Sequence, residues 1–182
     1  MENNKKFSAN GILWSSCKEY YKEILLELSR KYKIEQIAIY NLEKHYTDFI
    51  IECYQHDVDV MSDGYIEEKI KRLLQDDSAI IVAFTLSIKD PQYKHSPKGN
   101  LQCIQARNIK ELIRENFSRK VKNYFLDNII HLADNEYESK ILENLFNKYQ
   151  KYAFKGYLPK GDNPNYAIEL YKKYKDLNLE NR

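Results

Sequence analysis

Apolar residues recur along this chain with two spacings, and these predict alternating helices and strands. In several segments they return every three or four positions, so that they form one stripe on a helix. In others they form short continuous or alternating apolar stretches, which are typical of strands. The predicted helices cover residues 17–31, 43–54, 66–74, 104–113 and 135–152, and the predicted strands cover residues 11–14, 34–42, 78–88 and 121–130.

The order of these elements predicts the fold class. Ala79–Phe84 is apolar at every position, which is typical of a central strand covered on both sides. Residues 55–64 are rich in aspartate and residues 90–100 contain two prolines and a glycine, so both segments are predicted to be loops. Two strand–helix–strand crossovers then predict an α+β fold, namely a ferredoxin-like βαββαβ antiparallel sheet covered by helices.

The chain is predicted to form one domain followed by an extension. Residues 1–153 hold all the strands and the longest helical patterns. Residues 154–182 are rich in turn-forming glycine and proline and hold one short helical pattern at about 166–175. We expect this C-terminal extension to pack on the core or to be disordered.

Composition excludes some classes of function. The chain has 182 residues and a formal net charge of only +2, which gives no general electrostatic reason for binding a membrane surface or a nucleic acid. A short basic run that starts at Arg114 leaves a nucleic-acid partner open as an alternative hypothesis. A solvated helix face explains that run better, because acidic residues precede it.

Glycine and cysteine usage narrows the chemistry further. With five glycines, the chain contains neither a phosphate-binding P-loop nor a dinucleotide fingerprint. Its cysteines, Cys17, Cys53 and Cys103, are widely spaced, so we expect neither a zinc site nor a disulfide framework. Since no apolar span or leader pattern is visible either, the sequence predicts a cytoplasmic protein without a membrane partner.

His131 is the candidate for chemistry. It ends an apolar run and precedes an acidic turn, in which Asn135 and Glu138 form a predicted capping box for the next helix. A histidine fixed between a strand and a helix start suits acid–base or nucleophilic chemistry. The alternative is a histidine that only satisfies local hydrogen bonds at the end of a strand.

Several short segments of this sequence resemble segments of nucleoside diphosphate kinases and occur in the same order. Asn128-Ile-Ile-His131-Leu-Ala-Asp134, followed by Glu138-Ser139, is similar to that family's active-site segment Asn-x-x-His-Gly-Ser-Asp-Ser and its later Glu-Ser. Three further segments match in the same way. Glu43-Lys-His-Tyr46 is similar to the family's tyrosine-bearing helix, and Asp90-Pro91 is similar to its Asp-Pro turn. Ile113-Arg114-Glu-Asn-Phe117 is similar to its Ile-Arg-Gly-Asp-Phe.

The resemblance implies a mechanism and its residues. His131 would take the γ-phosphoryl group of a nucleoside triphosphate, with Mg²⁺ bridging the phosphates, and pass it to a nucleoside diphosphate. Glu143 would orient the histidine. The phosphates would contact Tyr46, Arg114 and Asn128. The resemblance also implies a homo-oligomer.

Departures from the family leave a second hypothesis open. Trp14-Ser-Ser-Cys17 stands where the family has Lys-Pro-Asp, and Leu132-Ala133 replaces the Gly-Ser after the histidine. Lys18 or Lys89 would have to supply the missing lysine, and Arg107 is only a loose match to a second phosphate-binding arginine. The alternative is therefore a catalytically inactive relative that senses nucleotides or binds proteins.

Overall fold

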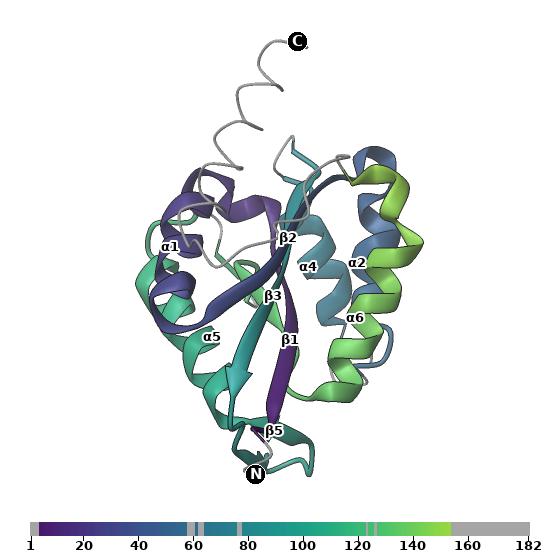
Figure 1. Ribbon diagram of the computed structural model, residues 1–182. Coiled ribbons are helices and arrows are strands. Elements are labelled where there is room, and N and C mark those ends of the chain that lie inside the picture. Colours follow the sequence, from purple (N-terminus) through teal and green to yellow (C-terminus); the bar gives the residue numbers. More distant parts are fainter. Residues whose placement is uncertain are drawn as a thin grey trace.

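A four-stranded antiparallel sheet forms the centre of the molecule (Figure 1). The computed structural model describes residues 4–57, 61, 64–75, 78–122, 124, 125 and 127–153. The strand order is β2-β3-β1-β6, and every neighbouring pair is antiparallel. The strands are β1 (Lys6–Leu13), β2 (Lys33–Asn41), β3 (Ile80–Lys89) and β6 (Ile130–Leu132). The predicted ferredoxin-like α+β fold is confirmed.

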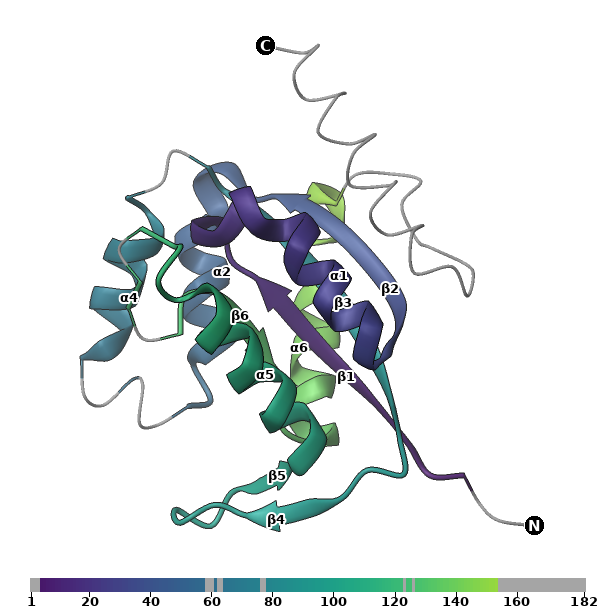
Figure 2. The same cartoon turned by 90° about the vertical axis from the view of Figure 1, so that its left-hand side faces the viewer.

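Helices cover both faces of this sheet. Figure 1 shows α1 and α5 on one face and α2 and α6 on the other, and Figure 2 shows α4 beyond the sheet edge that ends in β6. These five helices correspond to the five predicted helical segments, and both α2 and α4 lie between β2 and β3. The helices are α1 (Tyr21–Lys31), α2 (Tyr46–Tyr54), α4 (Tyr65–Leu73), α5 (Ile104–Phe117) and α6 (Glu136–Lys148).

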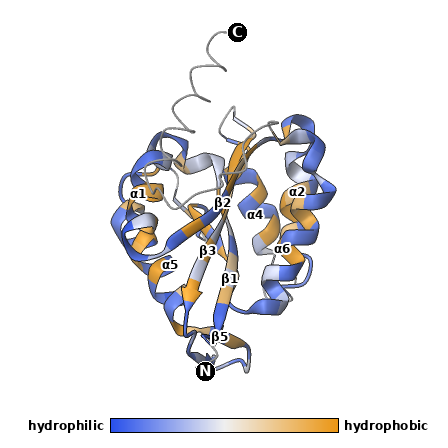
Figure 3. Ribbon diagram, viewed as in Figure 1, coloured by the Kyte–Doolittle hydropathy of each residue, from blue (hydrophilic) through white to orange (hydrophobic). Residues whose placement is uncertain are grey.

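Hydrophobic burial explains why β3 lies inside the sheet. All residues of β3 from Ile81 to Ile88 are buried, as the apolar run predicted. Figure 3 shows apolar residues gathered on the strands and on the helix faces turned toward them, with polar residues outside. The amphipathic helices therefore cover a sheet with two apolar faces. Among the described residues, no helix is long and apolar enough to cross a membrane.

Short 3-10 turns precede two helices where the sequence predicted unbroken helix. One spans Ser15–Tyr20 and leads into α1, and the other spans Glu43–His45 and leads into α2. Cys17 has non-helical backbone angles, which separates the first turn from α1. Tyr46 therefore begins α2.

The strand predicted over residues 121–130 was wrong in its extent, because β6 begins only at Ile130. Asp127 has a φ of +58°, and the Asn128 side chain accepts a hydrogen bond from the Phe125 N–H at 3.2 Å. Such a local side-chain turn competes with strand pairing. The loop predicted over residues 90–100 was also partly wrong, because β4 (Tyr93–His95) pairs with β5 (Leu101–Cys103) in a hairpin below the sheet (Figure 2). The predicted C-terminal helix lies outside the described residues.

Candidate functional site

A partly open pocket of about 260 Å³ lies beside β6. It is bounded by the end of α2, by α4 and α5, by the turn before β6, and by the start of α6. Basic, acidic and aromatic side chains all line it: Tyr54, His56, Asp57, Tyr65, Lys69, Lys110, Arg114, Asp127, His131, Leu132, Asp134 and Glu138. Polar groups from so many elements converge as they do in ligand sites.

His131 occupies the middle of the short edge strand β6. It pairs with Ile12 of β1, and its two strand neighbours, Ile130 and Leu132, are buried. The His131 side chain is half-buried and lines the pocket. Its ring meets the ring of Tyr54 edge to face, with centroids 5.1 Å apart. The imidazole is thus held by a strand and an aromatic ring and faces a cavity.

Two basic residues of α5 fix the backbone on either side of His131. Lys110 and Arg114 are four residues apart and so share one face of the helix. Lys110 Nζ donates to the Leu132 carbonyl at 3.1 Å and lies 2.8 Å from Asp134 Oδ1. Arg114 Nη2 donates to the Ile130 carbonyl at 3.3 Å, and its Nε lies 3.2 Å from Asp127 Oδ1. These bonds orient the strand and bring positive charge to its edge.

Burial and nearby cations keep the imidazole neutral. Burial lowers the pKa of His131 well below its ordinary value, and the positive charges of Lys110, Lys69 and Arg114 lower it further. An uncharged imidazole has a free lone pair, so it can act as a nucleophile at neutral pH.

Burial also perturbs other ionisable groups of the pocket, among them Lys69 and Glu138. Burial lowers the pKa of Lys69 to about 8, against the opposing effect of Asp127. Burial also raises the pKa of Glu138, whose carboxylate accepts a hydrogen bond from the Asp134 N–H at 2.9 Å. Clusters of perturbed groups in a cleft are typical of functional sites.

Glycine at position 11 lets β1 approach β6 and the histidine. A Cβ built on Gly11 would lie 2.8 Å from the His131 carbonyl oxygen and 2.4 Å from Cζ of Phe84. Real Cβ atoms essentially never come that close to other atoms. A side chain here would therefore have to displace the strand that carries the candidate nucleophile.

The structure brings two of the predicted site residues, His131 and Arg114, into the pocket. Tyr46 is buried in the core, where its hydroxyl lies 2.8 Å from Ser15 Oγ. Asn128 is also fully buried, and it shapes the turn before β6 without lining the pocket.

The remaining two predicted residues lie elsewhere. Glu143 is exposed on α6 and pairs with Lys140 at 2.9 Å. Lys89 is exposed at the far end of β3, opposite Lys6. On β1, Lys6 and Ile12 are six positions apart, about 20 Å along a strand. Because His131 pairs with Ile12, Lys89 does not join this site.

Sequence reasoning missed Tyr54, Lys69 and Lys110, and it marked Glu138 only as a capping residue and as part of the resemblance. Lys69 and Lys110 nevertheless left a signal. Lys69 lies on the apolar stripe of α4, between Ile66 and Leu73, and a lysine at a core position indicates a buried role. Lys110 lies one turn before Arg114, on the same helix face. No comparable signal marked Tyr54, because which tyrosine of α2 faces the pocket depends on how the helix packs.

Among the described residues, no group of three or more histidine, cysteine, aspartate or glutamate side chains is arranged to hold a metal ion. Two carboxylates of the pocket form ion pairs instead. Asp134 and Asp127 are each paired with a cation of α5.

Comparisons with known proteins come from the structure alone, because no protein-family model and no curated protein matches the sequence. The nucleoside diphosphate kinase of Aquifex aeolicus superposes with a TM-score of 0.52 at 12% identity, covering 84% of this chain and 97% of that chain. A nucleoside-diphosphate kinase from Borrelia burgdorferi, a transition-state mimic with bound vanadate and ADP, gives a TM-score of 0.52 at 12% identity, covering 90% and 96%. At this identity the likeness concerns the fold, and the chain therefore has a fold like that of the nucleoside diphosphate kinases.

Proposed function

We propose that this chain is a nucleotide-binding phosphotransferase that carries the phosphoryl group on His131. One observation supports this most directly: a half-buried imidazole, held neutral, lines a pocket into which the cations of α5 project. The fold, which resembles that of nucleoside diphosphate kinases, supports the same reaction class.

The proposed reaction has two balanced halves. An imidazole nitrogen of His131 forms a bond to the γ-phosphorus of a nucleoside triphosphate, and the bond from that phosphorus to its bridging oxygen breaks, which releases the diphosphate. In the second half, a terminal oxygen of another nucleoside diphosphate takes the phosphoryl group and frees the imidazole. Lys110 and Arg114 would offset the negative charge that spreads over the transferred oxygens.

A magnesium ion would arrive with the nucleotide, bound to its phosphates, and would not need a protein site of its own. Mg²⁺ usually keeps several waters and takes one or two carboxylates beside the substrate phosphates. Asp57 and Asp127 both line the pocket, and their carboxylates would contact such an ion. The bound ion would neutralise phosphate charge.

Labelling with γ-³²P-ATP tests the proposal. We expect protein-bound label that is stable in base and labile in acid, as a phosphohistidine is. His131→Ala should abolish the label, whereas His95→Ala, which changes an exposed histidine of the β4–β5 hairpin, should leave it intact. Label of equal amount in wild type and His131→Ala, or no label in wild type, would refute phosphotransfer through His131.

A second candidate function is nucleotide binding without phosphotransfer. The ion pairs of Lys110 with Asp134 and of Arg114 with Asp127 favour it, because cations already engaged by carboxylates stabilise the charge of a transferring phosphoryl group less well. In that case ADP, alone or with vanadate, would raise the melting temperature of the protein, and the protein would carry no label after incubation with γ-³²P-ATP. Labelling and thermal shift, measured on the same sample, separate the two functions.

A further inference from the structure

Lys69 is placed on α4 in a way that simple packing does not explain. It is 4% exposed, although it carries an ammonium group, and it lies among the buried residues of the helix, Ile66 and Leu73. Moving a charge out of water is expensive, and lysine is almost never fully buried unless its charge is paired. Asp127 and Asp57 offset only part of this cost, because the pKa of Lys69 is still lowered. Its side chain lines the same pocket as His131.

Tyr54 connects Lys69 to His131. The Lys69 ammonium lies 4.4 Å from the centre of the Tyr54 ring, and that ring meets the imidazole with centroids 5.1 Å apart. A cation over an aromatic face is attracted to the ring and is thereby held in place. The charge also reaches the histidine, since Lys69 is one of the cations that lower the pKa of His131.

Lys69 and the cations of α5 approach the pocket from different walls. Lys110 and Arg114 come from α5, next to the carbonyl groups of β6. Lys69 comes from α4. A phosphoryl group in front of His131 would therefore have cations on two sides, which suits a group whose negative charge is spread over three oxygens.

We propose that Lys69 contacts the phosphoryl group transferred to His131 and neutralises its charge, with Tyr54 holding the ammonium in position. This inference rests on the proposed function. It assigns a catalytic role to α4, which the sequence marked only as an amphipathic helix.

The pH dependence of the reaction gives a readout that a merely structural lysine would not produce. Burial lowers the pKa of Lys69 to about 8, so its charge is lost as the pH rises through that value. Burial raises the pKa of Cys53 to about 12 and that of Tyr54 well above its ordinary value, so neither titrates in this window. The other charged groups near Lys69 come from α5, from the end of α2 and from the turn before β6: Arg114, Asp57 and Asp127.

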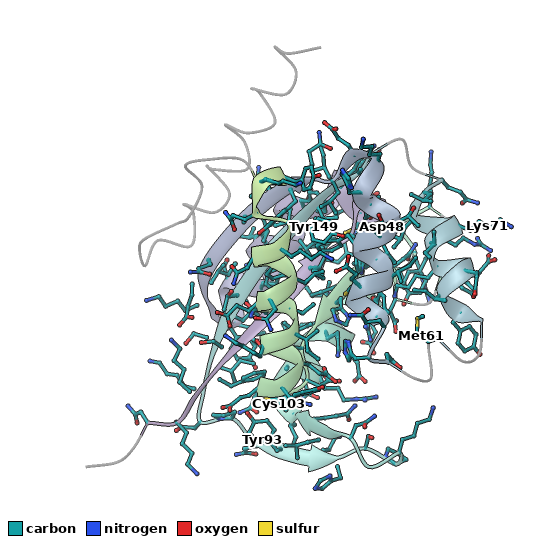
Figure 4. The ribbon with its side chains drawn as sticks, turned by 90° about the vertical axis from the view of Figure 1, so that its right-hand side faces the viewer. Asp48, Met61, Lys71, Tyr93, Cys103 and Tyr149 are labelled. Atoms are coloured by element: carbon teal, nitrogen blue, oxygen red, sulfur yellow. The ribbon has the colours of Figure 1, made fainter. Side chains whose placement is uncertain are left out.

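The experiment compares labelling rates of the full chain with γ-³²P-ATP at a concentration below saturation, where the rate reports the free enzyme. Lys69→Met keeps the length and removes the charge, and we expect the rate to fall about 100-fold or more, as when one charge-stabilising donor is lost. Its melting temperature should be unchanged or higher, because the lowered pKa of Lys69 indicates that its surroundings disfavour the charge that methionine removes. Lys71→Met is the matched control, since Lys71 is exposed on the same helix and points away from the body of the protein (Figure 4).

Lys69→Arg keeps the charge at every accessible pH. We expect it to recover part of the rate lost in Lys69→Met. The wild-type rate should fall as the pH rises through about 8, and the rate of Lys69→Arg should persist to higher pH.

The outcomes separate this inference from the proposed function. If wild type is labelled on His131 and Lys69→Met is labelled equally fast, the role of Lys69 is refuted and phosphotransfer stands. If wild type takes no label, both the proposed phosphotransfer and the role of Lys69 are refuted. If Lys69→Met unfolds, the wild-type pH profile decides, because a rate that stays level through pH 8 refutes the role of Lys69.

Discussion

Substituting Gly11 by alanine tests how the fold positions the candidate nucleophile. The new Cβ would lie 2.4 Å from Cζ of Phe84 and 2.8 Å from the His131 carbonyl oxygen. Phe84 is 1% exposed and has little room to move, and the carbonyl belongs to the paired strand β6. Relief of the contact therefore requires β1 and β6 to move apart.

The magnitude follows from two opposing effects. Overpacking a filled core costs about 1–3 kcal/mol. Replacing glycine by alanine restricts the unfolded chain and returns about 0.4–1 kcal/mol. With the middle of each range, the net loss in the free energy of unfolding is about 1.3 kcal/mol, which lowers the melting temperature by about 3–5 °C for a domain of this size.

Thermal and urea unfolding followed by circular dichroism measure this loss, and a double-mutant cycle locates it. Phe84→Leu removes the ring atoms that the new Cβ would touch. We expect Gly11→Ala with Phe84→Leu to be less destabilised than the sum of the single variants, by at least about 0.5 kcal/mol. The labelling rate of Gly11→Ala should also fall, since the strand bearing His131 is displaced.

One result would refute this reasoning. If Gly11→Ala unfolds at the wild-type temperature or above it, and its label accumulates at the wild-type rate, then β1 and β6 are not packed as closely as the structure places them. If Gly11→Ala is destabilised but shows no coupling to Phe84→Leu, then the close contact with the His131 carbonyl oxygen causes the loss.

Two further predictions concern a buried hydrogen bond and a titration. Ser139→Ala removes the hydroxyl that accepts from the Asn10 N–H at 3.0 Å, and leaving this buried group unpaired should lower the free energy of unfolding by about 1–3 kcal/mol in urea titrations; a loss below about 0.5 kcal/mol would contradict it. Because the pKa of His131 is lowered in the folded protein, the unfolded chain binds the extra proton first, so stability should fall as the pH drops below about 6.5. The fall should be shallower in His131→Gln, and equal slopes would exclude His131 as its source.

Local patterns were enough to predict most elements of the fold. The three- and four-residue apolar spacing located α1, α5 and α6, and the continuous apolar run located β3. Asn135 caps α6 as predicted, since its side chain accepts from the Glu138 N–H at 2.9 Å. These features depend on neighbours in the chain, so a sequence reveals them.

The same reasoning failed where pairing with a distant segment decides the structure. The exposed residues of β4 carry no apolar pattern, and they form a strand only because β5 lies beside them. The run before β6 is apolar enough for a strand, but Asp127 and Asn128 turn the chain there. In both cases, hydrogen bonds outweigh hydrophobic periodicity.

His131 of the candidate site could be predicted from the sequence, whereas several of its partners could not. His131 stood out in the sequence because it lies between an apolar run and a helix cap, and these two local features predict that its position is fixed. Its partners did not, because Tyr54, Lys69 and Lys110 are far apart in sequence and meet only through the packing of α2, α4 and α5 around β6.

The sequence by itself determined the order of strands and helices, and with it the fold class, because hydrophobic spacing is a local property. Only the tertiary structure decided which charges surround the imidazole. It placed Glu143 and Lys89 away from the site and brought in Lys69, because the rotation of a helix about its axis and the register of a strand depend on how the whole core packs.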